Sequence, residues 1–364
     1  MGTPKNLIDL PFEVLDLIFK NLDEWDKWPL ARVNNILGKA FAFHSRDNYE
    51  RISVHYCSSL FIMSVLPLCG ATVRHIEIDS SFEDFRILAD LVVKFCDNLL
   101  SITMDVSSRP DDIRGTKWFL NTGIKLKSVE INVRIDSKTF PKIAGTLKTL
   151  PGFKGLHLND IYMGVDPIIW SFLNLEALEL HFGPIQRRYN IFELCSPLKN
   201  LRNLKIYSTE VHSSINIDEF IALEKFTIGQ CIVSAPDLPF FKNLKAIGFV
   251  DNFTYVENMF FAWVLKHSKT LESLKFSYEN IQNDDFFKII KSCQNLRYID
   301  LKMDIDNLLS KSFITKLLGI LQENGVTPNN PFQLVTKKIT HAAMKKIMPD
   351  TPNSKLLDFF TYEH

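Results

Sequence analysis

A six-residue pattern of apolar, any, any, apolar, any and apolar positions recurs along most of this 364-residue chain. Its first positions are 21 to 27 residues apart, and ten copies begin at Val73, Leu99, Leu126, Phe153, Leu175, Leu201, Leu223, Leu244, Leu271 and Leu296. The alternation that ends each copy is typical of a half-buried strand. In the segments between copies, apolar residues at helical spacing cover residues 82–95, after an expected N-cap at Ser81. The same spacing occurs over residues 284–292. The pattern therefore predicts one strand in each unit, with helices in several of the intervening segments.

This periodicity resembles the leucine-rich repeat, whose unit places a short strand on the inner face of a horseshoe and a helix or irregular segment outside. The resemblance implies an α/β repeat fold, with a solenoid of about ten degenerate units over residues 51–305. The family often has Cys or Asn after the strand; Cys231 and Asn252 match, whereas Arg134, Ile161, Gly183 and Glu279 do not.

Residues 306–364 lack the six-residue pattern and are expected to form a C-terminal cap over the last repeat. We expect a helix from about residue 307 that ends near Gly325, a strand over Phe332–Thr336, and another helix over residues 340–348.

The amino-terminal residues 5–50 predict three short helices. Pro11 suits a first helical turn, a second proline-led start is expected at Pro29, and the third helix is expected over residues 35–49. In the first helix one broad apolar stripe follows helical spacing, and it consists of Val14, Leu15, Ile18, Phe19 and Leu22.

Residues Leu10 to Leu22 read Leu-Pro-Phe-Glu-Val-Leu-Asp-Leu-Ile-Phe-Lys-Asn-Leu, which resembles the F-box without a gap. Asp26 and the stretch from Leu30 to Val33 also fit that family, whereas the tryptophan common in its third helix is missing. The resemblance implies docking on a Skp-type adaptor, and through it on a cullin–RING ubiquitin ligase. The adaptor-binding residues that it implies are Leu10, Pro11, Val14, Leu15, Ile18, Phe19, Leu22, Leu30 and Val33.

A segment this short buries little of its own surface, so its stripe either binds a partner or seals the end of the repeats. Burying five such side chains yields roughly 1.5 to 3 kcal/mol each before the costs of association. We favour docking, because a cap needs no particular order of residues.

Strand residues between the apolar positions are expected to line the concave face of the repeats. The first five copies place acidic residues and histidines there, and the last five place lysines and tyrosines. We hypothesise a polarised groove that captures a protein substrate; the alternative is a solvated face. The candidate contacts are Glu77, Glu130, Glu179, Lys205, Tyr207, Lys225, Lys275, Tyr298 and Lys302.

Forty-two basic residues balance 42 acidic ones, which disfavours nucleic acid and anionic membranes as partners. The six cysteines contain no C-x-x-C pair, and His75, His157 and His181 have no recognisable set of further ligands, so neither a metal nor another cofactor is expected. No signal peptide or apolar run of about 20 residues is visible, and we expect an intracellular protein, cytoplasmic or nuclear.

Glycine-rich phosphate loops and catalytic signatures are also missing from the sequence, so we expect a non-catalytic protein. The predicted function is a substrate-recognition adaptor of an SCF-type ubiquitin ligase, which directs a bound protein to ubiquitination and degradation. The alternative is a leucine-rich-repeat scaffold without a ligase role.

Overall fold

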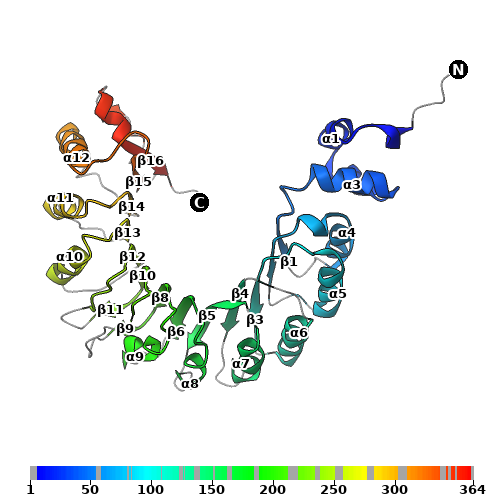
Figure 1. Cartoon of the computed structure of the whole chain (residues 1–364), viewed down its shortest axis with the longest axis horizontal. Helices are drawn as coiled ribbons and strands as arrows, with labels where there is room; N and C mark the ends of the chain where they lie inside the picture. Colours follow the sequence, from blue (N-terminus) through cyan, green and yellow to red (C-terminus); the bar gives the residue numbers. More distant parts are fainter. Residues whose placement is uncertain are drawn as a thin grey trace. The chain divides into compact units, whose positions relative to one another are not determined.

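The computed structural model describes residues 6–54, 59–79, 82, 84–107, 109–122, 126, 128–134, 140–150, 152–161, 166–183, 188–211, 220–233, 238–250, 257–276, 283–301, 310–336, 342, 346–348 and 351–361. The chain divides into two compact units, Met1–Leu158 and Asn159–His364. Each unit consists of a parallel sheet with helices against one face, as Figure 1 shows, which confirms the predicted α/β repeat. The predicted horseshoe shape stays a prediction.

The first unit begins with a 3₁₀ turn, Leu7–Asp9, and three short helices, α1 (Phe12–Lys20), α2 (Glu24–Ala31) and α3 (Asn35–His44). Helix α1 packs against α3, and α3 packs against α4, the first helix of the repeats. The three predicted helices are therefore present, but α2 starts five residues before Pro29, which lies inside it. Asp23 occupies the N-cap position of α2 with extended backbone, so the helix begins at Glu24. The predicted start at Pro29 was therefore wrong.

The sheet of the first unit has the order β1-β2-β3-β4-β5. The strands are β1 (Arg51–Val54), β2 (His75–Ile78), β3 (Ser101–Val106), β4 (Ser128–Arg134) and β5 (Phe153–Ile161), the last of which crosses into the second unit. The helices are α4 (Ser59–Cys69), α5 (Phe85–Phe95), α6 (Pro110–Leu120) and α7 (Phe140–Lys148), with a 3₁₀ turn at Gly70–Thr72. Helix α5 is the one predicted from residues 82–95; Asp84 is at its N-cap position, and Ser81 lies outside the described residues.

The sheet of the second unit continues in chain order as β6-β8-β10-β12-β13-β14-β15-β16. The strands are β6 (Ala177–Phe182), β8 (Asn203–Tyr207), β10 (Lys225–Gly229), β12 (Ala246–Val250), β13 (Ser273–Phe276), β14 (Tyr298–Leu301), β15 (Phe332–Thr336) and β16 (Leu357–Thr361). A small separate sheet joins β7 (Arg188–Tyr189), β9 (Glu210–Val211) and β11 (Ile232–Val233). The helices are α8 (Asp166–Ile169), α9 (Ile191–Cys195), α10 (Glu257–Lys266), α11 (Asn283–Ser292) and α12 (Lys311–Glu323), with a 3₁₀ turn at Pro352–Leu356.

The predicted strand Phe332–Thr336 is present as β15, and β16 extends the sheet beyond it in parallel register. Most of the helix expected over residues 340–348 lies outside the described residues. Helix α12 begins at Lys311, and the predicted start near residue 307 lies outside them as well.

The core follows the six-residue pattern, because its three apolar positions are buried in copy after copy. In the copy that begins at Leu201, for example, Leu201, Leu204 and Ile206 are at most 1% exposed. Side-chain amides also link successive repeats: Asn200, Asn243 and Asn295 each precede the leading leucine and donate to a main-chain carbonyl one repeat earlier. Cys231, the predicted turn residue, donates its thiol to the carbonyl of Gly229.

A buried histidine connects α10 to the loop that precedes β12. His267 is 1% exposed; its Nε2 accepts a hydrogen bond from the amide of Phe241 at 3.0 Å, and its Nδ1 lies 3.0 Å from the carbonyl of Trp263. The Nε2 acceptor requires the neutral ring with its proton on Nδ1. Burial lowers the pKa of His267 to about 4, against a weaker opposing effect of the Trp263 carbonyl.

We predict that this histidine makes folding pH-dependent. The unfolded chain binds a proton near pH 6.5 and the folded chain only near pH 4, so the stabilisation is full above pH 6.5 and is lost as the pH falls toward 4. The loss between pH 7 and pH 5 is on the order of 2 kcal/mol. Urea unfolding at pH 7 and pH 5, compared with the variant His267→Gln, measures it. An equal fall of stability in both proteins would show that other groups cause the pH dependence.

Candidate protein-interaction surfaces

The helical segment 6–50 has a core of its own. Leu15 and Phe19 of α1 are 0% exposed. The Phe19 ring lies 5.5 Å from the ring of Phe41 on α3 and 5.9 Å from the ring of His44. Asp16 Oδ1 lies 2.7 Å from His44 Nδ1 and adds a polar link between the same helices. The inner side of the predicted stripe therefore holds α1 on α3.

The nine predicted adaptor-binding residues fall into three groups. Pro11, Val14 and Val33 are exposed, and Leu10, Ile18, Leu22 and Leu30 are half-buried. Leu15 and Phe19 are fully buried within the segment. This corrects the prediction for these two residues, because a side chain that fills the segment's own core does not contact a partner.

Other apolar side chains of the segment are exposed and were missed in the sequence. Phe12 and Leu17 on α1 are 42% and 57% exposed, and Ile36 and Phe43 on α3 are 42% and 40% exposed. The rings of Phe12 and Phe43 stack at 6.3 Å, so these exposed residues extend from one helix to the other. We call Phe12, Val14, Leu17, Val33, Ile36 and Phe43 the exposed apolar set. The sequence could have indicated Phe12 and Leu17, because both are apolar residues of α1 that do not belong to the predicted stripe.

Other residues of the segment attach it to the repeats. Trp28 of α2 lies 4.8 Å from the ring of Phe41 and 5.9 Å from that of Phe61 on α4, and Tyr49 lies 6.2 Å from Phe61. Both predicted alternatives thus have a structural counterpart: α3 packs on the first helix of the repeats, while the exposed apolar set lies on α1, on α3 and, at Val33, just before α3.

In the first unit, helices cover one face of the sheet (Figure 1), and the other face carries hydrogen-bonded polar residues. Register places Thr103 between the predicted contacts Glu77 and Glu130, and Ser53 donates to Glu77 at 3.2 Å. His75 binds Ser101 Oγ through Nδ1 at 2.7 Å, and its pKa is lowered by burial and then by Arg51, against the effect of Glu77 and Glu130. This open face is polar, with carboxylates on separate strands.

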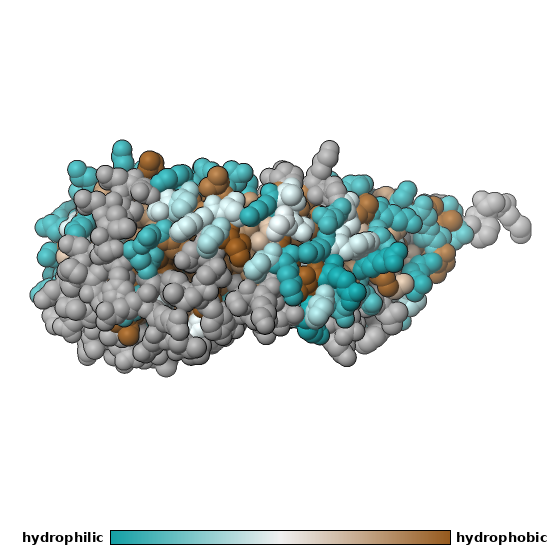
Figure 2. Space-filling view, turned by 90° about the horizontal axis from the view of Figure 1, so that it is seen from below, coloured by the Kyte–Doolittle hydropathy of each residue, from teal (hydrophilic) through white to brown (hydrophobic). Residues whose placement is uncertain are grey.

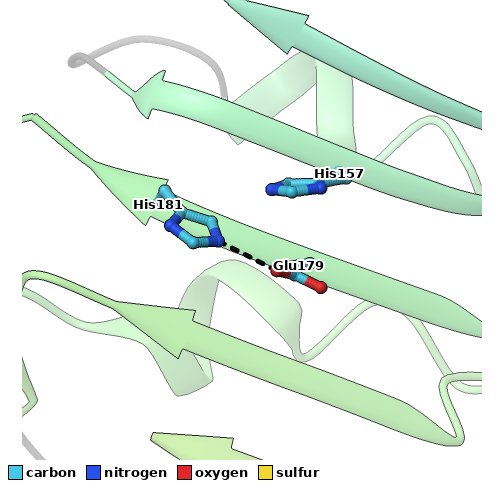
Figure 3. Close-up of side chains that lie close together, drawn as sticks. All are labelled: His157, Glu179 and His181. Atoms are coloured by element: carbon cyan, nitrogen blue, oxygen red, sulfur yellow. Dashed lines mark hydrogen bonds and ion pairs between the residues drawn. The ribbon is translucent and has the colours of Figure 1, made fainter. Parts of the chain in front are cut away.

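In the second unit, Glu179 on β6 accepts from two groups. His181 Nε2 lies 2.9 Å from Glu179 Oε1, and Lys205 Nζ on β8 lies 2.8 Å from Glu179 Oε2. The His181 ring stacks on that of Tyr207 at 4.1 Å. Figure 3 shows the hydrogen bond between Glu179 and His181, and also draws His157, which belongs to β5 in the first unit. Glu179 was predicted as part of an acidic half, yet it is paired with a lysine of the basic half.

The remaining predicted contacts lie farther along the same sheet. Lys275 Nζ on β13 lies 3.0 Å from Asp300 Oδ2 on β14, and Asp300 is 2% exposed. Burial, and then Asp300, raises the pKa of the neighbouring Tyr298. Lys225 on β10 is exposed, and Lys302 lies outside the described residues. The open face of this unit therefore mixes lysines with paired carboxylates.

The five described cysteines, Cys69, Cys96, Cys195, Cys231 and Cys293, are buried free thiols. Burial is the main cause that raises the pKa of each one, to about 12 for Cys69. They are thus suited to packing and poorly suited to nucleophilic chemistry. Cys57 lies outside the described residues, and within the described helices none is long and apolar enough to cross a membrane.

The surface seen in Figure 2 has apolar residues interspersed with hydrophilic ones, and no broad apolar area occurs among the residues coloured there. Isolated apolar residues are normal on a soluble surface. We therefore define the exposed apolar set by the exposed fractions of its side chains, and not by a visible apolar patch.

No family model matches the sequence, and no curated protein matches it either. Among solved structures, the chain is similar to Rad7 in the Rad7–Elc1 complex of yeast, with 15% identity over 90% of this chain and 88% of the other and a TM-score of 0.49. It is similar to an internalin (inlF) of Listeria monocytogenes, with 12% identity, 75% and 83% coverage and a TM-score of 0.32. It is also similar to TLR13 in a TLR13–ssRNA13 complex, with 14% identity over 76% of this chain and a TM-score of 0.39, and it spans 37% of the TLR13 chain.

We predict that two neighbouring leucines of α1 respond differently to a charge. Leu15→Asp places a carboxylate in the core of the segment and costs several kcal/mol, on the order of 4, whereas Leu17→Asp on the exposed side costs under about 1 kcal/mol. Limited proteolysis and thermal unfolding of the full chain compare the two variants. Equal losses would mean that α1 is not packed as described.

Proposed function

We propose that this protein is the non-catalytic substrate-recognition subunit of an SCF-type cullin–RING ubiquitin ligase. The helical segment docks on a Skp-type adaptor, and an open face of the repeats captures the protein to be ubiquitinated. One observation carries this proposal: the gapless F-box pattern from Leu10 to Leu22 coincides with a helix that is anchored on one side and exposes apolar side chains on the other.

The exposed apolar set fits an adaptor groove in its chemistry. Its six side chains are 39% to 68% exposed, so a partner would remove apolar surface from water without unfolding the segment. An amphipathic helix bound in a groove is a common mode of recognition between proteins. The anchoring residues Leu15 and Phe19 contribute indirectly, by fixing the positions of α1 and α3.

The alternative is a leucine-rich-repeat scaffold without a ligase role. The packing of α3 on α4 and the ring contacts of Phe61 with Trp28 and Tyr49 favour it, since they are what a cap needs. A cap, however, gives no reason for the apolar side chains of the segment that are 39% to 68% exposed.

The test is co-expression of the full chain with a Skp-type adaptor, followed by size-exclusion chromatography and a titration. We predict a one-to-one complex, and a loss of affinity of about 100-fold or more in the double variant Val14→Asp with Leu17→Asp. Loss of the exposed apolar contacts, and not unfolding, is the expected cause.

The matched control is Ile87→Asp with Val93→Asp on α5. These residues are 40% and 52% exposed, close to the 39% and 57% of Val14 and Leu17. The control should keep the complex. If the wild type is well folded and forms no complex, or if both double variants weaken it equally, the scaffold alternative takes its place. A cullin pull-down from the purified complex then tests for a complete ligase.

A further inference from the structure

Six residues of the second unit lie side by side across six strands of its sheet. The register of β6, β8, β10, β12, β13 and β14 places in one row Glu179, Lys205, Thr227, Gly248, Lys275 and Asp300. We call these residues the central row. Its two lysines lie between its two carboxylates, and the neutral Thr227 and Gly248 lie between the two lysines.

The two ion pairs occupy the ends of this row. Lys205 Nζ is 2.8 Å from Glu179, and Lys275 Nζ is 3.0 Å from the buried Asp300. The lysine side chains are 39% and 40% exposed. An ammonium group has three N–H donors, so a lysine held by one carboxylate is fixed in place and keeps donors for a ligand. The positive charges therefore flank the centre of the row.

The centre of the row has small side chains, and Gly248 itself is buried. Gly248 has no side chain, and a Cβ built there would lie 2.7 Å from Thr227 Oγ1, so a larger residue would displace Thr227. The adjacent pair Ala246 and Ser273 is also small. A glycine inside a strand weakens it, and such positions often mark the close approach of a ligand or another backbone.

A second row beside the first one is apolar. It runs from His181 through Tyr207 and Gly229 to Val250. The Tyr207 ring stacks on His181 at 4.1 Å and also covers Gly229, where a Cβ would lie 2.5 Å from the ring. On the other side of the central row, Lys225 is exposed and adds a third positive charge. The open face thus has a stretch of small residues between two lysines, with an aromatic edge.

We propose that the central row binds an extended acidic segment of a protein partner, which lies across the strands from β8 to β13. The carboxylates of the segment contact Lys205 and Lys275, and an apolar side chain packs on Tyr207. The identification of this partner as the captured substrate rests on the proposed function; the binding itself does not.

Strand spacing sets the sequence that fits. Neighbouring strands are about 4.8 Å apart, so Lys205 and Lys275 are attached about 14 Å apart, three strands from each other. An extended peptide advances about 3.4 Å per residue, and alternate side chains point the same way, so positions i and i+4 are also about 14 Å apart on one side. Acidic residues at i and i+4 therefore match the two lysines, and residue i+2 lies midway between them, over Thr227 and Gly248.

The experiment is a fluorescence anisotropy titration of the full chain with three labelled peptides of equal length. The first peptide has glutamates at i and i+4, the second has glutamines there, and the third has the glutamates at adjacent positions. We expect the second and third peptides to bind about tenfold more weakly than the first. The variant Lys205→Gln with Lys275→Gln should weaken the first peptide by about the same factor.

The matched control is Lys242→Gln with Lys291→Gln, which removes the same charge from exposed lysines outside the central row. This control should leave binding unchanged, and Lys205→Arg should retain it, while thermal unfolding verifies that each variant is folded. Equal binding of the glutamate and glutamine peptides, an equal effect of the control variant, or no binding of the first peptide overturns the proposal. If the chain forms the adaptor complex but does not bind the first peptide, only the proposed peptide site is contradicted. If it binds the peptide but forms no adaptor complex, only the ligase role is contradicted.

Discussion

Parallel backbone pairing between consecutive repeats is the constraint on which the rest of the structure depends. The residue after the leading leucine offers its carbonyl to two amides of the next repeat: Glu176 accepts from Arg202 and Asn203, and Glu224 accepts from Lys245 and Ala246. A strand held in this way has one possible register, because a slip of one residue would expose its buried side chains. The rows of side chains on the open face are a direct consequence of that register.

The asparagine before the leading leucine supports the same arrangement from the edge of the sheet. Asn200, Asn243 and Asn295 donate to carbonyls that no strand partner satisfies, one repeat earlier. These bonds lie at the exposed surface, where each contributes about 1 kcal/mol or less and links the turn before a strand to the preceding repeat. The same contact thus recurs in repeats whose lengths range from 21 to 27 residues.

Most of the strands that could be predicted from sequence have three apolar positions in the six-residue pattern; β15, which was also predicted, lies outside it. Strand β1 was missed because only Ile52 and Val54 are buried in it, and β16 because no leading leucine marks the pattern. In α1, the predicted apolar stripe included both Leu15 and Val14. Because apolar residues occur on several sides of this helix, the sequence could not tell which of them is buried. Only packing against Phe41 distinguishes the buried Leu15 and Phe19 from the exposed Val14 and Leu17.

The candidate contacts illustrate a second limit of sequence analysis. From the sequence, the ten copies were divided into an acidic first half and a basic second half. Glu179 and Lys205 were therefore assigned to differently charged halves of the predicted groove. Because their strands are neighbours in the sheet, the two side chains meet at 2.8 Å and partly neutralise one another. Net charge counted along the sequence therefore overstates the field on the open face, and recognition depends on where unpaired donors remain. In the second unit such donors belong to Lys205 and Lys275, and only the register of the strands from β8 to β13 defines the spacing between these two lysines.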